Sequence, residues 1–206
     1  MSDREQRTHQ TYKNIAPEYA AAECNPNSWI DIFYKFQKHT PRGAVLDLGC
    51  GHSRDAALFV PAGYQYVGID SCRELLSIGQ KNHPQAALAE MNMYQLCLKD
   101  AAFDGVWATG SLLHIPKNRL KNALDEVYRV MKTGGTLFAA VKQGLGEKML
   151  QGVYRQERLY TLYNPEEFRE RLSESGFKVF FDAENHKDLN PPHDMSIWLV
   201  YLATKK

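Results

Sequence analysis

Short apolar runs alternate with amphipathic segments along most of the chain, and the two patterns predict different elements. The apolar runs predict five strands, at residues 44–48, 64–70, 86–90, 103–109 and 136–141. The segments between them carry apolar residues at three- and four-residue spacing and predict helices at residues 53–59, 72–81 and 118–131. Regular alternation of strand and helix is typical of an α/β fold with a parallel sheet.

The first forty residues are predicted to be helical. Residues 4–22 and 28–39 each place apolar side chains at helical spacing, so each segment predicts an amphipathic helix. Pro17 lies within the first segment, and because proline lacks a backbone N–H donor we expect a break or a helix start there. Ser28 or Asn27 is the expected N-cap of the second helix.

The last third of the chain departs from simple alternation. Residues 142–163 are polar, with several glycines and tyrosines, and predict a mobile insertion beside the carboxyl edge of the sheet. A helix is expected from Asn164, with proline at its first position, and it ends at Gly176. Strands at 177–182 and 196–203 then form a hairpin around a polar loop.

The composition indicates a single globular domain. The chain has 206 residues, of which 44% are hydrophobic and 24% are charged, and its formal net charge is +1. That balance gives no long-range attraction to nucleic acid or to anionic lipid. No apolar run reaches the length of a membrane span, and the first seven residues lack the apolar segment of a signal peptide. We therefore expect a cytoplasmic protein with no membrane partner.

The spacing of cysteine and histidine argues against a metal centre. The four cysteines, at positions 24, 50, 72 and 97, include no Cys-x-x-Cys pair, which favours reduced thiols over a disulfide framework or a zinc site. His186 and His193 share the last polar loop without clustered carboxylates, so we interpret them as loop residues. We expect no metal cofactor.

The most informative chemistry lies in residues 44–56, which read Ala-Val-Leu-Asp-Leu-Gly-Cys-Gly-His-Ser-Arg-Asp-Ala. An apolar strand ends near Asp47, and Gly49 and Gly51 follow one residue apart. Glycine allows positive φ and close approach of the backbone to a ligand, as in the crevices where α/β sheets bind nucleosides. A pyrophosphate site would have a small residue in place of Arg54, whereas the Asp47 carboxylate favours a ligand with a cationic head.

A second acid, Asp70, ends the next predicted strand. It lies nineteen residues beyond Gly51, close to the spacing at which an acid reaches a ribose. Its two carboxylate oxygens can accept hydrogen bonds from both ribose hydroxyls. A strand-ending aspartate by itself is more often a helix cap, and it is the combination with the glycine turn that favours ribose binding.

These motifs resemble those of the class I, Rossmann-like S-adenosylmethionine-dependent methyltransferases of the small-molecule type. Residues 12–19 are similar to a Tyr-x-x-x-Ala-x-x-Tyr segment on the helix that covers the cofactor in that family. Residues 103–115 are similar to the family's Phe-Asp-x-Val segment with its later Leu-x-His-Ile. Residues 126–137 are very close to its Glu-Val-x-Arg-Val-Leu-Lys-Pro-Gly-Gly-x-Leu segment, which supports the fold and carries no information about the substrate.

The resemblance implies an α/β fold with a seven-stranded, mostly parallel sheet. Its strand order is 3-2-1-4-5-7-6, with strand 7 antiparallel and helices on both faces. It also implies a single domain over residues 1–206. Residues 1–40 then form a helical lid, and residues 41–206 form the Rossmann-like core, with 142–163 as an insertion.

The resemblance further implies a site for S-adenosylmethionine, with S-adenosylhomocysteine as the product. The implied cofactor-binding residues are Tyr19, Asp47, Gly49, Cys50, Gly51, Asp70, Ser71, Asn92, Met93, Thr109 and Gly110. Asp47 and the glycines are expected at the methionine end, and Asp70 at the ribose. Asn92 stands where the family commonly has an acid that receives the adenine amino group, so a loop-capping role is its alternative.

Methyl transfer from a sulfonium needs in-line positioning of the acceptor, and it needs a base only if the acceptor must lose a proton. Candidate catalytic residues at the acceptor are His114, Tyr19 and Tyr160, although a histidine at this position of the family is often structural. Arg155, Arg158 and Tyr160 are candidates to contact an anionic or phenolic acceptor, with solvated surface as their alternative.

We expect a small-molecule acceptor, and three other interpretations stay open. A protein methyltransferase need not leave a motif for its substrate groove. A tRNA or other nucleic-acid methyltransferase typically has Asn-Pro-Pro-Tyr after the fourth strand, whereas residues 109–112 read Thr-Gly-Ser-Leu. A non-catalytic interaction protein predicts damaged cofactor motifs, and here they are intact. A monomer and a homodimer are both compatible with the sequence.

Overall fold

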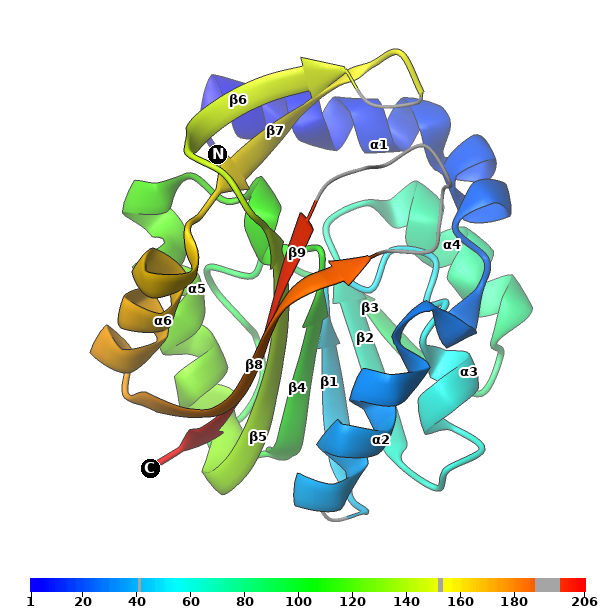
Figure 1. Cartoon of the computed structure of the whole chain (residues 1–206). Coiled ribbons are helices and arrows are strands. Elements are labelled where there is room, and N and C mark those ends of the chain that lie inside the picture. Colours follow the sequence, from blue (N-terminus) through cyan, green and yellow to red (C-terminus); the bar gives the residue numbers. More distant parts are fainter. Residues whose placement is uncertain (41, 152–153, 188–196) are drawn as a thin grey trace.

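The computed structural model describes residues 1–40, 42–151, 154–187 and 197–206, with backbone alone for 184–187. Strands with helices on both faces form its centre (Figure 1). The sheet has seven strands in the order β3-β2-β1-β4-β5-β9-β8. Their bounds are β1 Ala44–Leu48, β2 Gln65–Asp70, β3 Ala87–Glu90, β4 Phe103–Thr109, β5 Met131–Lys142, β8 Phe177–Lys187 and β9 Ile197–Lys205.

This order confirms the predicted 3-2-1-4-5-7-6 arrangement. Strands β3, β2, β1, β4 and β5 pair in parallel, and β9 pairs antiparallel with both β5 and β8. Parallel neighbours align their carboxyl ends at one edge, so the ends of β1, β2 and β4 lie beside one another at the centre of the sheet. The glycine turn after β1, Asp70 at the end of β2 and Thr109 at the end of β4 are thereby brought together.

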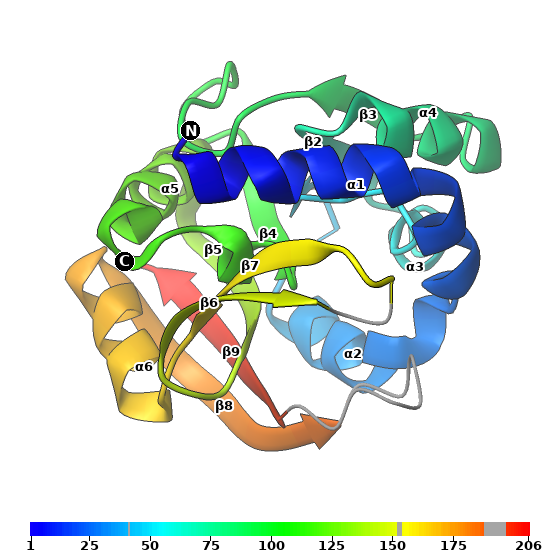
Figure 2. The ribbon, with the colours of Figure 1, turned by 90° about the horizontal axis from the view of Figure 1, so that it is seen from above.

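The helices agree with the predicted pattern in number and position. They are α1 Asp3–Ala22, α2 Ile30–His39, α3 Ala56–Phe59, α4 Arg73–Asn82, α5 Lys117–Val130 and α6 Pro165–Glu174, with short 3-10 turns η1 Pro26–Trp29 and η2 Leu112–His114. Seen from above, α5 and α6 lie on one side of the sheet, and α2 and α3 lie on the other (Figure 2). The large core aromatics Trp29, Phe36, Phe59, Trp107 and Phe138 meet between α2 and the sheet.

Two local predictions about the N-terminal helices were wrong. Helix α1 continues through Pro17, because proline removes only one intrahelical hydrogen bond and the helix buries Ile15, Ala16 and Ala20 around it. The cap of the second helical segment is Asn25, whose side chain accepts from the Asn27 amide at the start of η1. The predicted helix at 53–59 is also shorter, because Ser53 has a φ of 60° and α3 begins only at Ala56.

The insertion at 142–163, which the sequence predicts to be a mobile segment, has regular structure in part. It contains a two-stranded hairpin of β6 Gly146–Gln151 and β7 Glu157–Leu162. Both views place the hairpin beside α1 above the carboxyl edge of the sheet (Figures 1 and 2). Thr8 and Thr11 of α1 bond to the backbone of β7, whose residues 158–161 are buried. Burial against α1 therefore gives this polar segment a regular structure. Gly152 lies outside the described residues.

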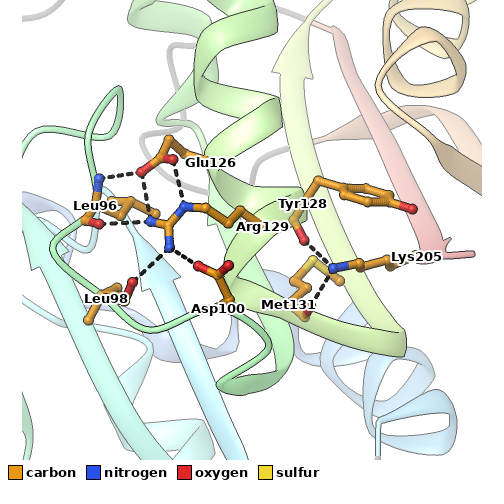
Figure 3. A network of polar contacts seen from close by, with 8 residues as sticks. All are labelled: Leu96, Leu98, Asp100, Glu126, Tyr128, Arg129, Met131 and Lys205. Carbon is orange, nitrogen blue, oxygen red and sulfur yellow. Dashed lines mark hydrogen bonds and ion pairs between the residues drawn. The ribbon is translucent and has the colours of Figure 1, made fainter.

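The segment 126–137 supports the fold through side chains as well as through its glycines. Arg129 on α5 donates to the carbonyl oxygens of Leu96 and Leu98, both at 2.8 Å, and also contacts Asp100 (Figure 3). Glu126 accepts from the Leu96 amide at 2.6 Å and pairs with Arg129. These bonds hold the long connection between β3 and β4, whose first residues border the candidate site.

We expect Arg129→Ala to lower the free energy of unfolding by about 2 kcal/mol, because two backbone carbonyls and a carboxylate lose a charged donor together. Lys121→Ala on the same helix is the matched control. Lys121 pairs only with Asp125 one turn away, and both side chains are exposed, so its loss costs about 0.5 kcal/mol or less. Urea denaturation of both variants measures the difference, and equal midpoints would contradict the role of Arg129.

Candidate functional site

One cavity opens at the carboxyl edge of the sheet, with about 960 Å³ of empty space when its open mouth is counted. Ten of the residues predicted from the sequence line it. They are Tyr19, Gly49, Gly51, Asp70, Ser71, Asn92, Met93, Thr109, Gly110 and His114. Asp47, Cys50 and Tyr160, also predicted, are not among its lining residues. The cavity is therefore built from the ends of β1, β2 and β4 and is bordered by α1.

The turn after β1 has the conformation that its glycines predict. Gly49 and Gly51 have φ angles of 73° and 55°, which favour glycine. The amides of Gly49 and Cys50 both donate to the carbonyl oxygen of Ile69, at 2.8 and 2.9 Å, so the turn is fixed to the end of β2. A Cβ on Gly49 would lie 2.4 Å from the Cβ of Ser111, so only glycine lets the two loops meet.

The Asp70 carboxylate links the glycine turn to α4. Its Oδ2 accepts from the Gly51 amide at 2.9 Å, and its Oδ1 accepts from the Cys72 amide at 2.8 Å. Burial raises the pKa of Asp70, and the hydrogen bonds from backbone amides oppose that shift. Each carboxylate oxygen has a second lone pair, so Asp70 can accept further hydrogen bonds from a ligand in the cavity.

Asp47 lies beneath the turn rather than at the cavity wall. Its Oδ2 accepts from the Tyr66 hydroxyl at 2.6 Å, and its side chain is buried. Burial, together with the charge of Asp55, raises the pKa of Asp47 well above its usual range. Cys50 also lies away from the cavity, and burial likewise raises the pKa of its thiol well above the usual range.

Sequence reasoning missed the structural role of Asp55. Its carboxylate accepts from the indole N–H of Trp107 at 2.8 Å and from the Nε of Arg54 at 2.7 Å. Thr109, at the end of β4, also contacts it at 3.4 Å. Asp55 thus connects the segment after the glycine turn to β4. The available signal was Trp107 itself, since a buried indole N–H needs an acceptor.

A hydrogen-bonded chain crosses one wall of the cavity and fixes the state of His114. The Nδ1 of His114 lies 2.5 Å from the Leu159 carbonyl oxygen, which can only accept, so Nδ1 carries the proton. In the neutral ring Nε2 then accepts from the Tyr12 hydroxyl at 2.8 Å. The Tyr12 oxygen in turn accepts from Nη1 of Arg158 at 3.0 Å. Burial, and next the charge of Arg158, lowers the pKa of His114 to about 3.

Aromatic rings extend this wall. Tyr19 packs edge-on against Tyr12, with ring centroids 5.3 Å apart, and both tyrosines line the cavity. Tyr160 packs against the outer side of His114 at 5.3 Å and is buried. Tyr12 belonged to a predicted motif but was not among the predicted site residues. Its periodic position on α1 signalled only an apolar helix face.

The loop after β3 forms the far end of the cavity and is tied to α1. The Asn92 side-chain oxygen accepts a hydrogen bond from the Tyr94 amide at 3.0 Å. This is the loop-capping role that the sequence predicts as the alternative for Asn92. The Tyr94 hydroxyl donates to Glu5 at 2.6 Å, and Arg119 both pairs with Glu5 and stacks on the Tyr94 ring. Met93, with Asn92, lines the cavity. The start of α1 is therefore held over this loop.

Within the described part of the chain, no group of three His, Cys, Asp or Glu side chains is arranged to hold a metal ion. None of the helices described there is long and apolar enough to cross a membrane. His193 lies outside the described residues, and only the backbone of His186 is described.

A family model described as a methyltransferase domain matches residues 46–139, which include the glycine turn, Asp70 and the loop after β4. Solved structures of S-adenosylmethionine-dependent methyltransferases share the fold of the chain. The chain is thus similar to the class I methyltransferases, in sequence over residues 46–139 and in fold.

Individual relatives show how far this similarity extends. A demethylmenaquinone methyltransferase of Streptomyces avermitilis is 35% identical over 95 residues, which are 46% of this chain and 40% of that protein. The chain spans between 40% and 59% of the length of the first three curated relatives it matches.

The fold of the methyltransferase domain extends over the whole chain. The Burkholderia thailandensis 1,6-didemethyltoxoflavin-N1-methyltransferase, solved with its substrate and S-adenosylhomocysteine, covers all of this chain with a TM-score of 0.79 at 18% identity; 92% of that structure is matched. The [4+2]-cyclase SpnF covers 98% of this chain with a TM-score of 0.76 at 18% identity, and 96% of it is matched. Since one of these neighbours is a cyclase, the fold alone does not decide the reaction.

Proposed function

We propose that this methyltransferase domain binds S-adenosylmethionine and transfers its methyl group to a small-molecule acceptor by in-line displacement. The observation that carries the proposal is the position of the Asp70 carboxylate. It lies in the same cavity as the positive-φ glycines and is bonded to the amide of one of them. This arrangement offers a ribose-binding acid beside a backbone cradle with no Cβ atoms in the way.

Different lining residues suit the ribose, the adenine and the methionine end of the cofactor. Asp70 keeps free lone pairs for the two ribose hydroxyls, and the loop of Asn92 and Met93 lies at the adenine end. At the other end, the buried Oγ of Ser111 has no hydrogen-bond partner within the described residues and borders the cavity beside Gly49. When bound there, S-adenosylmethionine supplies a methyl group that already carries its own leaving group.

Asp47 acts from below in this proposal. Its buried carboxyl group accepts a hydrogen bond from Tyr66 beneath the glycine turn, where the cationic methionine head is expected, and so supports the turn without lining the cavity. Tyr19 and the backbone of Thr109 and Gly110 border the same end. Cys50 contributes through its backbone amide, which holds the turn to Ile69.

His114 serves to position Tyr12 rather than to remove a proton. Its Nε2 already accepts from the Tyr12 hydroxyl, and its lowered pKa makes the imidazole a weak base. Tyr160 supports the His114 ring from outside the cavity. The residues of this wall therefore exclude water and orient the acceptor, which is most of what methyl transfer from a sulfonium requires.

The cover over the cavity supports a small acceptor. Helix α1 and the β6–β7 hairpin are joined by Thr8, Thr11 and the ion pair of Arg7 with Glu157. A protein or tRNA substrate needs an open groove at the methyl group, whereas here α1 and the β6–β7 hairpin lie side by side over this edge of the sheet (Figure 2). The near-zero net charge also gives no support for a nucleic-acid substrate.

The test is calorimetric titration with S-adenosylhomocysteine. We expect binding by the wild type and at least tenfold weaker binding by Asp70→Asn, which corresponds to about 1.4 kcal/mol or more. Glu90→Gln is the matched control, because Glu90 is the register partner of Asp70 at the end of the neighbouring strand and pairs with exposed Arg73. Unchanged affinity in Asp70→Asn would reject the ribose assignment. A wild type that binds no S-adenosylhomocysteine would reject the function.

A further inference from the structure

Arg158 of β7 is a buried cation with no acidic partner among the described residues. Arg158 is only 7% exposed. Its guanidinium group contacts the rings of Tyr12, Tyr154 and Tyr160, and the guanidinium carbon lies 5.3 to 5.6 Å from each ring centroid. Nη1 donates to the Tyr12 hydroxyl, and Nε has no hydrogen-bond partner within the described residues. The charged partners that act most strongly on Arg158 are the tyrosines Tyr12, Tyr160 and Tyr19, and no ion pair to it is found among the described residues.

Other arginines show how unusual this is for the molecule. Three arginines that are more exposed than Arg158 each contact a carboxylate: Arg54, Arg119 and Arg129. Buried charges in folded proteins are normally paired, because an unpaired ion loses its hydration without compensation. Among the described residues, Arg158 therefore differs from these three arginines in having no carboxylate partner.

A further unsatisfied donor lies at the same place. The buried hydroxyl of Tyr154 has no partner within the described part of the chain, and its ring packs on both Arg158 and Tyr19. Guanidinium and phenol groups are hydrogen-bond donors that suit an oxyanion, and the fork of arginine matches a carboxylate or a phosphate.

We propose that Arg158, with the Tyr154 hydroxyl, binds a carboxylate or phosphate group of the methyl acceptor. This inference rests on the proposed function and names the class of its substrate. The position of Arg158 indicates that the anionic group belongs to the acceptor and not to the cofactor. Arg158 lies on the hairpin behind Tyr12 and does not line the cavity that contains Asp70 and the glycine turn. An acceptor held there by its anionic end points its remaining atoms toward that cavity.

The first experiment separates charge from shape. Benzoate, benzamide, acetate and inorganic phosphate are added to the protein with and without S-adenosylhomocysteine, and binding is followed by thermal shift and calorimetry. We expect an anion, but not the uncharged benzamide, to stabilise the wild type. Arg158→Gln and Arg158→Met should weaken that binding at least tenfold. Arg155 was a sequence candidate for the same contact, but the structure leaves it exposed on the connection between β6 and β7, so Arg155→Gln should leave the binding unchanged.

The second experiment identifies the source of the anion and excludes a structural role. In Arg158→Gln we expect unchanged affinity for S-adenosylhomocysteine and for methylthioadenosine, which lacks the amino-acid tail. Without ligand, Arg158→Met should melt at or above the wild-type temperature, because it removes an unpaired buried charge.

Three results would overturn the inference. The first is that wild type and Arg158→Gln respond equally to every anion. The second is that Arg158→Gln loses affinity for S-adenosylhomocysteine but keeps its affinity for methylthioadenosine. The third is that both Arg158 variants melt at a lower temperature than the wild type. A different result would contradict the proposed function. In that case the wild type binds no S-adenosylhomocysteine, and its responses to the anions can still be measured.

Discussion

Gly49→Ala is expected to lower the free energy of unfolding by about 4 kcal/mol. Part of the loss, about 1 to 2 kcal/mol, comes from placing a Cβ on a residue with a φ of 73°. The rest comes from overlap, since the new Cβ would lie 2.4 Å from the Cβ of Ser111, well inside van der Waals contact. The backbone has to move, and the turn bonded to Ile69 moves with it, so binding of S-adenosylhomocysteine should be lost as well.

Two matched variants separate strain from overlap. Gly134 has nearly the same φ, 78°, and a Cβ there meets nothing within 4 Å, so Gly134→Ala should cost only the strain of about 1 to 2 kcal/mol. Ser111→Gly removes the atom that the new Cβ strikes, so in that background Gly49→Ala should also cost about 1 to 2 kcal/mol. Urea denaturation measures both effects. If Gly49→Ala costs no more than Gly134→Ala, the close approach of the two loops is not a constraint.

The second large effect is a loss of stability in mild acid, and two buried histidines cause it. Burial lowers the pKa of His52 to about 4 and that of His114 to about 3. In the unfolded chain histidine takes up a proton below its ordinary pKa of about 6.5. Between pH 6.5 and about 4 the unfolded state therefore binds more protons than the folded state, and stability falls as the pH falls. Each histidine contributes up to about 1.4 kcal/mol per pH unit.

Asp47 opposes this trend. Burial and then Asp55 raise its pKa well above the usual range, so from the ordinary aspartate pKa of about 3.8 upward the folded state holds the proton more tightly. Its contribution to stability decreases as the pH rises through that window and partly offsets the histidines on acidification. Variants of the histidines are therefore needed to isolate their share.

Replacing both histidines in His52→Gln/His114→Gln is expected to reduce the pH dependence of the unfolding free energy by up to about 2.7 kcal/mol per pH unit between pH 6.5 and 4. His39→Gln is the control for a His→Gln replacement at an exposed position, at the end of α2. Urea denaturation at half-unit pH steps measures the slopes. If the double variant and the wild type have parallel curves, these rings are not held neutral by burial.

Much of the fold was predictable because its signals are local. The apolar runs and helical periods located the strands and most helices, and the resemblance supplied the strand order that the structure confirms. Errors occurred where a distant contact outweighed a local preference. Pro17 remains inside α1 because residues on both sides of it are buried. The polar insertion forms a hairpin because β7 packs on α1, about 150 residues earlier in the sequence.

The candidate site divides in the same way. Gly49, Gly51 and Asp70 lie in the cavity as expected, because turn geometry and the alignment of parallel strands follow from residue type and spacing. Asp47 was expected at the cavity wall, but the acceptor hydrogen bond with Tyr66 holds it below the turn. Asp55 was not predicted at all, because its partner Trp107 lies on another strand.

The sequence alone determined where the strands end, which positions must be glycine and which acid lies beside the glycine turn, since these depend on backbone conformation and short spacings. Only the tertiary structure decided the chemistry of the opposite wall. There His114 is held as a neutral ring by Tyr12 and Leu159, and Arg158 is buried with no ion-pair partner in the described part of the chain. Protonation and pairing depend on burial and on partners from distant segments, and neither can be obtained from periodicity or spacing.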